Sequence, residues 1–491
     1  MERTPFFKAF GPLLFGRRSR SGIEQIQRLT TLEDLYAIFG DLFPERLLGR
    51  SDKGPNSRRR SLPPSVTFWA FVSQALNPKS SCREVVRKIE AWNRWAHLRT
   101  AIGVSASAYC QARARLDLDA LLLIRRQIAW QSERNVSRKD KWLQGRPVKI
   151  IDGTALSMPD TAENQALWPQ PSSQKEGCGF PQLKLVGLFS LQTGTLLEEA
   201  MGDRHIHEQR LFQSLWDRLE KKDIILEDRG FCSYLSMSAL LRRGVDTVAR
   251  LHQARKCDWR TGRRLGPGDR LMVWSKPQQC PADWSREDFA ALPDELSVRL
   301  IRSVIEVEGF RTRTVVLATT LTDPGLYPAD ELRKLYGERW NVELHFAQIK
   351  TILGIDVLRC QNPETVGREV QIHLIAYNLI RALMLRAGSI HHVPVGRISF
   401  KGTLDTLRHW VDVIHASRRQ PKKQAQLATQ MLAVIAADPL PLRPGRSEPR
   451  ATKRRPKNYQ LLNKPRRLMG NLPHRNRRRK QYPVRPKSPL S

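Results

Sequence analysis

The sequence predicts a mixed α/β protein, and three observations lead to that prediction. Segments of strand and helix character alternate through residues 146–250. Strand-like segments dominate residues 252–330, and residues 24–135 read as helical and basic. Because 40% of the 491 residues are hydrophobic, the chain can bury real cores, and its length suits two to four domains.

The N-terminal region, residues 1–140, is predicted to be a helical DNA-binding domain. Apolar residues recur at helical spacing over Leu29–Phe39, and Arg83–Trp95 and Ala108–Ile124 mix apolar and basic residues at the same period. A loop rich in Arg, Ser and Pro, Ser51–Pro64, lies between them. The alternative is a helical scaffold whose arginines are merely solvated.

Residues 141–251 are predicted to form the first part of an α/β core. The expected strands are Val148–Asp152, Lys184–Ser190, Thr195–Ala200, Asp223–Asp228 and Asp246–Leu251, and the expected helices are His207–Leu219 and Ser236–Arg243. Thr193-Gly194 suits a hairpin turn between two of these strands. Alternation of this kind is typical of a layered α/β architecture.

Residues 252–325 are predicted to be a β-rich insertion into that core. Strand-like runs at Arg270–Ser275, Leu296–Val307 and Arg311–Leu321 replace the alternating pattern. Glu308-Gly309 stands where a hairpin turn is expected.

The α/β core is expected to resume over residues 326–438, with an apolar helix at Val370–Arg386. Residues 439–491 then form a basic tail: Arg443–Ser491 holds 17 Lys and Arg against one acid. Such a segment cannot bury enough apolar surface to fold alone, so we expect a disordered arm that follows DNA. Tyr459–Leu462 is a stretch that could dock on the body.

The charge of the chain indicates its class of partner. A formal net charge of +35 and a pI near 10.6 favour polyanions bound by counterion release, with nucleic acid first and an acidic membrane surface as the alternative. No apolar run approaches the roughly 18 residues that cross a bilayer. The N-terminus has only a short apolar stretch, Phe10–Phe15, and no small-residue cleavage site, so no signal peptide is expected.

The seven cysteines are scattered and contain no Cys-x-x-Cys pair, which disfavours a zinc ribbon. Their odd number and low density also disfavour a disulfide framework. We therefore expect a protein of a reducing cytoplasm. No Gly-rich phosphate loop is present, so ATP use is not indicated.

Two aspartates are predicted to stand where strands end. Asp152 closes Val-Lys-Ile-Ile-Asp152 and Asp228 closes Ile-Ile-Leu-Glu-Asp228. Open α/β sheets place their functional sites at such ends. The alternative for each residue alone is a turn former or a helix cap.

A third carboxylate stands in a segment of unusual spacing. Tyr336, Arg339, Glu343 and Lys350 have offsets of 0, 3, 7 and 14, which fall within an arc of about 60° on one α-helix. One face then carries a phenol, a guanidinium, a carboxylate and an ammonium. The alternative is a solvated helix stabilised by the Arg339–Glu343 pair.

The three carboxylates together predict a metal site. Mg²⁺ prefers hard oxygen ligands and keeps several waters, so Asp152, Asp228 and Glu343 suffice to hold it. Two such ions, about 3.5–4 Å apart, can activate a nucleophile and stabilise the leaving oxygen of an in-line phosphoryl transfer. Mn²⁺ is the expected substitute.

These residues resemble the DDE transposases of bacterial insertion sequences, specifically the IS-four family. The Tyr336-x2-Arg339-x3-Glu343-x6-Lys350 spacing matches that family's signature without gaps. Asp152-Gly-Thr154 with Met158–Thr161 and Asn164 resembles its first-acid block, and Asp228–Phe231 resembles its second. The resemblance covers residues 145–390 well, whereas the ends match only in general character.

The resemblance implies a ribonuclease-H-like catalytic core interrupted by a β insertion, and cut-and-paste or related DNA transposition. It implies that Asp152, Asp228 and Glu343 hold Mg²⁺ and are catalytic. Water would nick the transposon end, and the freed 3′-OH would attack the opposite strand, forming a hairpin in related members, and later target DNA. A homodimer bridging two transposon ends is also implied.

The resemblance further implies DNA contacts. Tyr336, Arg339 and Lys350 are expected at phosphates near the scissile bond, and Arg229, beside the second acid, is also assigned to DNA. Related members stack a flipped base on an aromatic of the insertion. Trp274 is the candidate here, with Trp259 and Trp284 as rivals and burial in the core as the alternative.

Other polar groups compete less well. His205 and His207 share a face only on a strand, and Arg204 and Arg210 crowd them, so a transition-metal site is disfavoured. The competing carboxylates are Asp160, Glu163, Asp203 and Glu227. Glu227 should point to the other side of its strand from Asp228, and Asp160 lacks a buried strand before it.

The resulting prediction is a metal-dependent DNA transposase. Two other classes remain: a ribonuclease-H-like nuclease that cuts without joining, and a catalytically inactive DNA-binding derivative of a transposase. Strand-transfer products separate the first, and substitution of the three acids separates the second.

Overall fold

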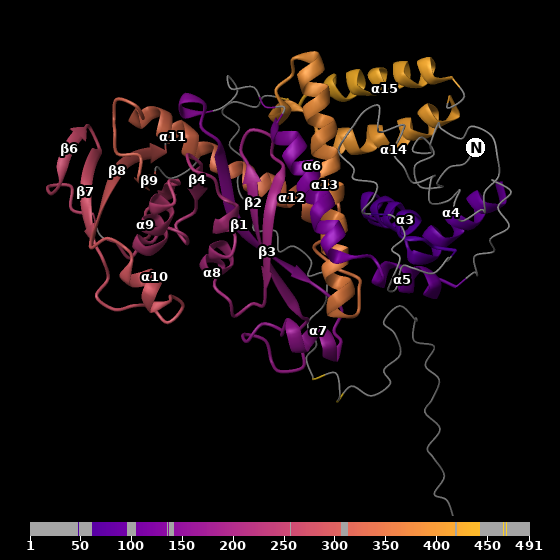
Figure 1. Ribbon diagram of the computed structural model, residues 1–491, viewed down its shortest axis with the longest axis horizontal. Helices are drawn as coiled ribbons and strands as arrows, with labels where there is room; N and C mark the ends of the chain where they lie inside the picture. Colours follow the sequence, from indigo (N-terminus) through magenta and orange to yellow (C-terminus); the bar gives the residue numbers. More distant parts are fainter. Residues whose placement is uncertain are drawn as a thin grey trace, which may run out of the picture.

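In the computed structural model of the protein, a large twisted sheet lies beside a group of helices (Figure 1). Helices from the N-terminal and C-terminal parts of the chain gather on one side of the molecule, and the strands β6–β8 lie on the other. The residues that the structure describes are 48, 61–95, 105–134, 136, 142–255, 257–305, 313–417, 420–441, 465 and 468.

Within the described residues, nine strands form one sheet in the order β3-β2-β1-β4-β5-β9-β8-β7-β6. Their bounds are β1 Val148–Ser157, β2 Gln182–Ser190, β3 Leu196–Gly202, β4 Ile224–Glu227, β5 Asp246–Arg250, β6 Arg263–Gly266, β7 Asp269–Ser275, β8 Glu295–Ile305 and β9 Arg313–Thr319. The β1–β4 and β4–β5 ladders are parallel, and the others are antiparallel. A mixed α/β fold is thereby confirmed.

Both faces of the central strands are buried. Ile150 and Leu226 belong to one hydrophobic core, whereas their neighbours Ile151 and Ile225 belong to another. Successive side chains of a strand point to opposite faces, so the two cores lie on opposite sides of the sheet. This explains why β4 reads as a continuous apolar run in the sequence.

The long helix α13 (Pro363–His391) organises one face of the sheet. Asn362 caps its first turn by accepting a hydrogen bond from the Thr365 N–H at 3.0 Å. The helix predicted at Val370–Arg386 is confirmed and is longer than expected. Helix α13 packs against α3 (Pro64–Leu76), α6 (Leu118–Arg134), α14 (Phe400–Ala416) and α15 (Pro421–Ala436).

The N-terminal helices differ in one respect from the prediction. The stretch Ala108–Ile124 forms two helices, α5 (Ser107–Ala114) and α6, instead of one. The backbone N–H of Leu116 bonds to the carbonyl of Arg113, and the Asp117 carboxylate accepts the Asp119 N–H, so one helix ends and another begins. Helix α4 (Cys82–Trp95) lies where predicted.

Three sequence predictions lie outside the described residues, wholly or in part. They are the helical pattern at Leu29–Phe39, most of the loop Ser51–Pro64 and the turn at Glu308-Gly309. Nearly all of the tail 439–491 lies outside them as well.

The strands predicted for the insertion are confirmed as β7, β8 and β9. They continue the core sheet through the β5–β9 ladder, in which Val248 pairs with Thr319. Only the short helix α10 (Arg286–Ala290) interrupts the β structure between β7 and β8. These strands therefore extend the central sheet on the β5 side.

The remaining helices are short. They are α7 (Ala162–Leu167), α8 (Glu208–Gln213), α9 (Tyr234–Arg242), α11 (Ala329–Gly337) and α12 (Asn341–Ala347). The helix predicted at His207–Leu219 is wrong in length, because α8 ends at Gln213 and a 3-10 turn follows at Trp216–Arg218. Backbone bonds of the i, i−3 type at Leu215 and Leu219 close these tighter turns.

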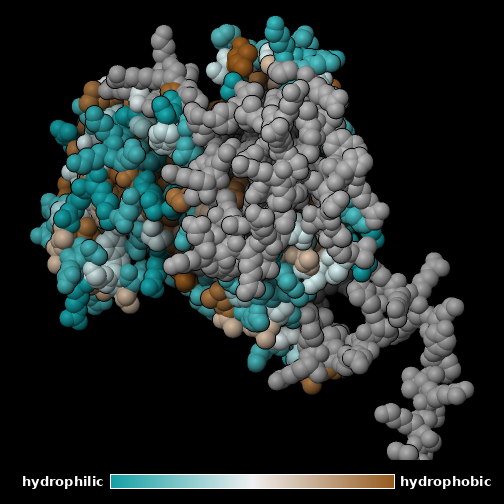
Figure 2. All heavy atoms as spheres, turned by 45° about the vertical axis from the view of Figure 1, so that its right-hand side comes forward, coloured by the Kyte–Doolittle hydropathy of each residue, from teal (hydrophilic) through white to brown (hydrophobic). Residues whose placement is uncertain are grey.

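The coloured surface in Figure 2 is mostly hydrophilic, with scattered apolar residues. Single exposed apolar side chains are ordinary for a folded protein. None of the helices in the described ranges is both long and apolar enough to span a membrane.

A network of buried ion pairs connects helix α6 to the edge strand β3. Arg125 is fully buried and lies 3.0 Å from a Glu198 oxygen and 2.5 Å from a Glu199 oxygen. Its Nε donates to Gln371 of α13 at 3.2 Å. Burial raises the pKa of Glu199, and the Arg125 charge opposes that rise.

Removing this cation should destabilise the fold strongly. Arg125→Ala leaves the buried Glu199 carboxylate without its guanidinium, whereas Glu198 keeps Arg126 at 2.6 Å, so the apparent free energy of unfolding should fall by about 3–5 kcal/mol. Urea denaturation followed by circular dichroism measures it. Lys401→Ala, which breaks an exposed pair with Asp405, is the control and should change that free energy by about 0.5 kcal/mol or less. Equal small changes in both variants would contradict the role of the network.

Candidate active site

The register of β1 and β4 places Asp152 and Asp228 side by side. The last parallel pair is Ile150 with Leu226. Asp152 stands two positions further along β1, and Asp228 stands two positions further along the chain, directly after β4. Two positions preserve the face, so both side chains lie on the side of Ile150 and Leu226. The negative charge of Asp228 also contributes to raising the pKa of Asp152, which agrees with their proximity.

The prediction that Asp152 ends a strand is wrong. β1 continues to Ser157 because β2 pairs with it in antiparallel register along its whole length, with Asp152 opposite Gly187. Only the β4 side of β1 loses its partner at that point, since β4 ends at Glu227. Asp228 does follow the end of its strand, as predicted.

The signature segment is a helical run of changing pitch, and the prediction of one regular α-helix is wrong. Tyr336 lies in α11, Arg339 in a 3-10 turn (Glu338–Trp340), Glu343 in α12 and Lys350 in a π-helical turn (Gln348–Ile352). Turns of both kinds alter the angular step per residue, and π turns are frequent at functional sites. Trp340, in the 3-10 turn, is 52% exposed.

Arg339 joins the first and third carboxylates. Its Nη1 is 3.8 Å from an Asp152 oxygen, and its Nη2 is 3.6 Å from a Glu343 oxygen. Helix α12 packs on β1, which is how Glu343 reaches the face that carries Asp152. The structure therefore brings Asp152, Asp228, Arg339 and Glu343 to one place.

The other two signature residues contact the same two strands. Lys350 Nζ donates to the Thr154 hydroxyl at 3.1 Å and to the Ala155 carbonyl at 3.0 Å on β1. The Tyr336 hydroxyl donates to the Glu227 carbonyl of β4 at 3.2 Å. Burial raises the pKa of Tyr336, so its phenol stays protonated and able to donate.

The pKa of Asp152 is raised to about 6, chiefly because the carboxyl is buried. Carboxylates of Glu208 and Asp228 raise it further, whereas the Gly153 N–H, at 2.8 Å, and Arg339 lower it. The balance leaves Asp152 partly protonated near neutral pH until a cation replaces or supplements Arg339.

Glu208 is a fourth carboxylate that the sequence did not point to. It is the first residue of α8, and a β-carbon added at Gly153 would lie 2.6 Å from its carboxyl carbon. Glycine at position 153 therefore leaves room for this side chain beside Asp152. The one local signal is the Asp152-Gly153 pair, because a glycine after a strand carboxylate permits such an approach.

The donor chemistry of the site fits a hard divalent cation. Carboxylate oxygens of Asp152, Asp228 and Glu343 are the ligands that Mg²⁺ prefers. Within the described residues, however, no three His, Cys, Asp or Glu side chains are already arranged to hold an ion. Arg339 lies between two of the three acids, Asp152 and Glu343, and its guanidinium supplies a positive charge between them.

The remaining predicted contacts lie outside this cluster. Arg229 is exposed and donates to Gln253 at 3.0 Å. Trp274 is only 6% exposed and packs in a hydrophobic core formed by α9, β5 and strands β7–β9, with the Arg255 guanidinium carbon 3.9 Å from its ring centroid. Its rivals are more exposed: Trp259 carries Arg302 over its ring and Trp284 packs near Trp216.

Glu227 and Asp160, which competed with the site acids, take other positions. Glu227 is fully buried on the face of Ile225, and neither carboxyl oxygen has a hydrogen-bond partner among the residues that the structure describes. Burial therefore raises its pKa well above the usual range. Asp160 accepts a hydrogen bond from Gln165 at 2.8 Å.

Comparison with known proteins identifies the family. Residues 143–379 match the model for the transposase DDE domain, and residues 45–124 match the model for the N-terminal domain of the insertion element 4 transposase. The chain belongs to the IS4 family of DDE transposases. It is thus an enzyme of DNA cleavage and strand transfer, and the resemblance seen in the sequence is confirmed.

Individual relatives agree with this assignment. The chain is 26% identical to transposase InsG of insertion sequence element IS4 from Escherichia coli (strain K12) over 446 residues, 89% of this chain and 96% of that protein. It is 31% identical over 77 residues, 16% of this chain and 21% of that protein, to the putative transposase InsL of element IS186A from the same strain.

Among solved structures, the chain aligns with piggyBac transposase in a synaptic complex with hairpin DNA. The alignment covers 90% of this chain and 86% of that one, with 12% identity and a TM-score of 0.39. A likeness of that size carries no argument about the fold or the site.

The pKa of Asp152 predicts a pH limit for DNA cleavage by this transposase. At Mg²⁺ concentrations below saturation, the cleavage rate should fall about tenfold per pH unit below about 6, as Asp152 takes up a proton. Glu208→Gln removes a nearby negative charge, so the acidic limb should move to lower pH. The measurement is the pH profile of cleavage of a labelled transposon-end duplex.

The exposed Glu287 of the insertion supplies the control, because Glu287→Gln removes the same charge far from Asp152. Its profile should coincide with that of the wild type. An acidic limb that Glu208→Gln leaves in place, or that Glu287→Gln also moves, would contradict the coupling of Glu208 to Asp152.

Proposed function

We propose that this transposase binds the ends of an insertion sequence and catalyses Mg²⁺-dependent cleavage and strand transfer with Asp152, Asp228 and Glu343. The observation that carries the proposal is the convergence of these acids on one face of the sheet, with Arg339 between Asp152 and Glu343. These carboxylates surround the Arg339 guanidinium, which a metal ion could replace. Such an arrangement suits a metal ion that binds together with the DNA substrate.

The three carboxylates would hold the ions, two Mg²⁺ or in their place Mn²⁺. Bound there, the ions would lower the pKa of the attacking water or 3′-OH and neutralise charge at the leaving oxygen. Asp152 and Asp228 come from rigid neighbouring strands, which fix their separation. Glu343 comes from a helix and is 44% exposed, so its side chain can adjust as the ions bind.

The scissile phosphate would be bound by Arg339, Lys350 and Tyr336. A guanidinium forms paired hydrogen bonds to phosphate oxygens, and Arg339 is already aimed at the acidic cluster. The contacts of Lys350 and Tyr336 with β1 and β4 hold both donors at the same edge. Arg229 and an aromatic of the insertion, Trp274 first, are the proposed outlying DNA contacts.

Several broader features belong to the same proposal. The order β3-β2-β1-β4-β5, three antiparallel strands followed by two in parallel, supports a ribonuclease-H-like core. Residues 1–140 would bind the transposon end and the tail 439–491 would follow the backbone of the DNA, given the net charge of +35. The working unit would be a homodimer acting on the bacterial nucleoid.

Cleavage of a labelled transposon-end duplex tests the proposal directly. Wild-type protein with Mg²⁺ should release a 3′-OH end that is then converted to a hairpin or joined to target DNA. Glu343→Ala should lower the cleavage rate about 10³-fold or more, because it removes a ligand that supports several kcal/mol of transition-state stabilisation. Chelation of the metal should have the same effect.

Glu331→Ala is the matched control, since Glu331 is an exposed acid at the start of the same helical run. DNA binding, followed by fluorescence anisotropy, should be retained in both variants. Cleavage without joining would favour a nuclease, and binding without cleavage by the wild type would favour an inactive derivative. Equal cleavage by wild type and Glu343→Ala would show that the third acid has been misassigned.

A further inference from the structure

Strand β1 is open along part of one edge. On its other edge β2 pairs with it along nearly its whole length. On the open side β4 pairs with it only as far as Ile150, and within the described residues the next backbone pairing is a parallel bridge between Ser157 and Val357. Asp152 and the contacts of Lys350 with β1 lie between these two points. The chain around Val357 therefore bounds the proposed active site at its far end.

Residues 353–362 form a bridging segment between the turn that carries Lys350 and helix α13. The segment directly follows the π-helical turn Gln348–Ile352 and ends at the N-cap of α13. Two backbone hydrogen bonds join it to β1: the Ser157 N–H donates to the Asp356 carbonyl at 3.2 Å, and the Leu358 N–H donates to the Ser157 carbonyl at 2.9 Å. A displacement of the bridging segment would therefore shift both the end of β1 and the position of Lys350.

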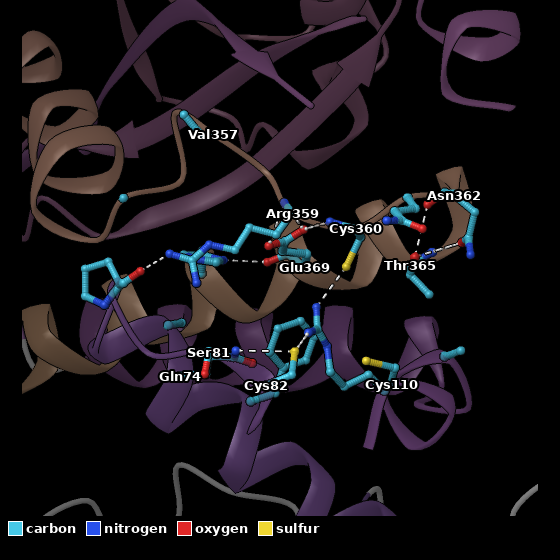
Figure 3. A pocket seen from close by; sticks show the side chains of 18 of the residues that line it. Gln74, Ser81, Cys82, Cys110, Val357, Arg359, Cys360, Asn362, Thr365 and Glu369 are labelled. Atoms are coloured by element: carbon cyan, nitrogen blue, oxygen red, sulfur yellow. Dashed lines mark hydrogen bonds between the residues drawn. The ribbon is translucent and has the colours of Figure 1, made fainter. Parts of the chain in front are cut away.

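The other side of the bridging segment faces the N-terminal helices across a cavity of about 630 Å³ (Figure 3). The Arg359 guanidinium donates to the Ser80 carbonyl at 2.9 Å and also to the Pro78 carbonyl. Both carbonyls belong to the loop between α3 and α4. From α5, Arg113 donates to Cys360 Sγ at 2.8 Å. Because the cavity leaves fewer packed side chains between the two parts, these hydrogen bonds hold their spacing.

The backbone of Arg359 is itself held by a buried carboxylate. Glu369 of α13 is 3% exposed and accepts the N–H groups of Arg359 and Cys360, each at 2.9 Å (Figure 3). Hydrogen bonds to a charged acceptor are stronger than those between neutral groups. The planar guanidinium then fixes the direction as well as the length of its two bonds to the loop. Arg359 therefore joins α13, the bridging segment and the N-terminal helices.

We propose that Arg359 is a positioning residue for DNA cleavage. It holds the bridging segment against the N-terminal helices, and the bridging segment in turn holds the end of β1 and the turn of Lys350. Through these contacts, the binding of a transposon end by residues 1–140 reaches the catalytic acids. The inference rests on the proposed recognition of the transposon end by those residues, and it adds the route by which correct binding supports the cut.

A direct bond to a DNA phosphate is the alternative role, because Arg359 is an exposed residue. Its guanidinium already donates to two carbonyls, and a phosphate would compete with both bonds. The two roles differ in their consequences. Loss of a phosphate contact weakens DNA binding, whereas loss of a positioning residue slows the cut in DNA that is already bound.

Hydrogen exchange in the wild-type protein tests the connection without any substitution. In the absence of divalent metal, the transposon-end duplex should slow exchange about threefold or more in the α3–α5 peptides and in those that contain Ser157 and Leu358. A duplex of scrambled sequence should leave the Ser157 and Leu358 peptides unchanged. Strand β7 is the internal control, since it pairs with β6 and β8 and lies outside this series of contacts. Slower exchange in α3–α5 alone would overturn the proposal.

Cleavage under single-turnover conditions tests Arg359 itself. With full-length protein in saturating excess, Arg359→Ala should lower the rate constant on the transposon-end duplex about 10–100-fold, because a misplacement of about 1 Å can cost that much. On the scrambled duplex the rate constant should change by about twofold or less, since no specific hold is lost there. The dissociation constant for the end, measured by fluorescence anisotropy, should change by about threefold or less.

Arg408→Ala is the matched control. Arg408 of α14 donates to the Leu76 carbonyl at 2.9 Å, so it also ties a helix to the N-terminal helices but lies outside the bridging segment. The rate constant of this variant on the end should stay within about twofold of the wild type. Equal losses in both variants, equal losses on both duplexes, or a large loss of affinity in Arg359→Ala would overturn the positioning role. A wild type that binds the end no better than the scrambled duplex would refute end recognition, and this inference with it.

Discussion

The proposed active site depends on a short parallel contact between β1 and β4. Three residue pairs, ending with Ile150 and Leu226, set the two strands in register. Since the side-chain period of a strand is two, this register alone puts Asp152 and Asp228 next to each other on one face. A slip of one residue would turn one aspartate into the opposite core, where Ile151 and Ile225 now pack. The hydrophobic pattern that stabilises the sheet therefore also fixes the acids.

The sequence predicted most strands but not the geometry of the site. Strand β4 is a short apolar run, and β8 is a longer run in which apolar and polar residues largely alternate. These local patterns are sufficient to predict both strands. Asp152 was misplaced because its strand is prolonged by β2, a partner that the local pattern does not reveal. The 3-10 and π turns around Arg339 and Lys350 leave no signal in the local sequence pattern, and Glu208 approaches Asp152 from a distant part of the sequence.

The signature spacing retained its value even though the helix is irregular. A regular helix would carry Tyr336, Arg339, Glu343 and Lys350 as a stripe on one surface. In the structure, Tyr336 and Lys350 instead reach the backbones of β4 and β1, and Arg339 reaches Asp152. The spacing of these four residues therefore reflects their contacts with the two strands that precede or carry the aspartates. These contacts belong to the tertiary structure, although the spacing is visible in a short stretch of sequence.

The ion pairs of the fold and of the site differ in a way that suits their tasks. Arg125 with Glu199, and Arg299 with Asp269, meet at 2.5 and 2.6 Å with the guanidinium fully buried. Arg339 lies 3.8 and 3.6 Å from its two carboxylates, one of them half-exposed. Short buried pairs are costly to break and hold helices and strands together. The longer contacts of Arg339 cost less to exchange, which agrees with the proposal that this residue releases the acids to metal and turns to a phosphate.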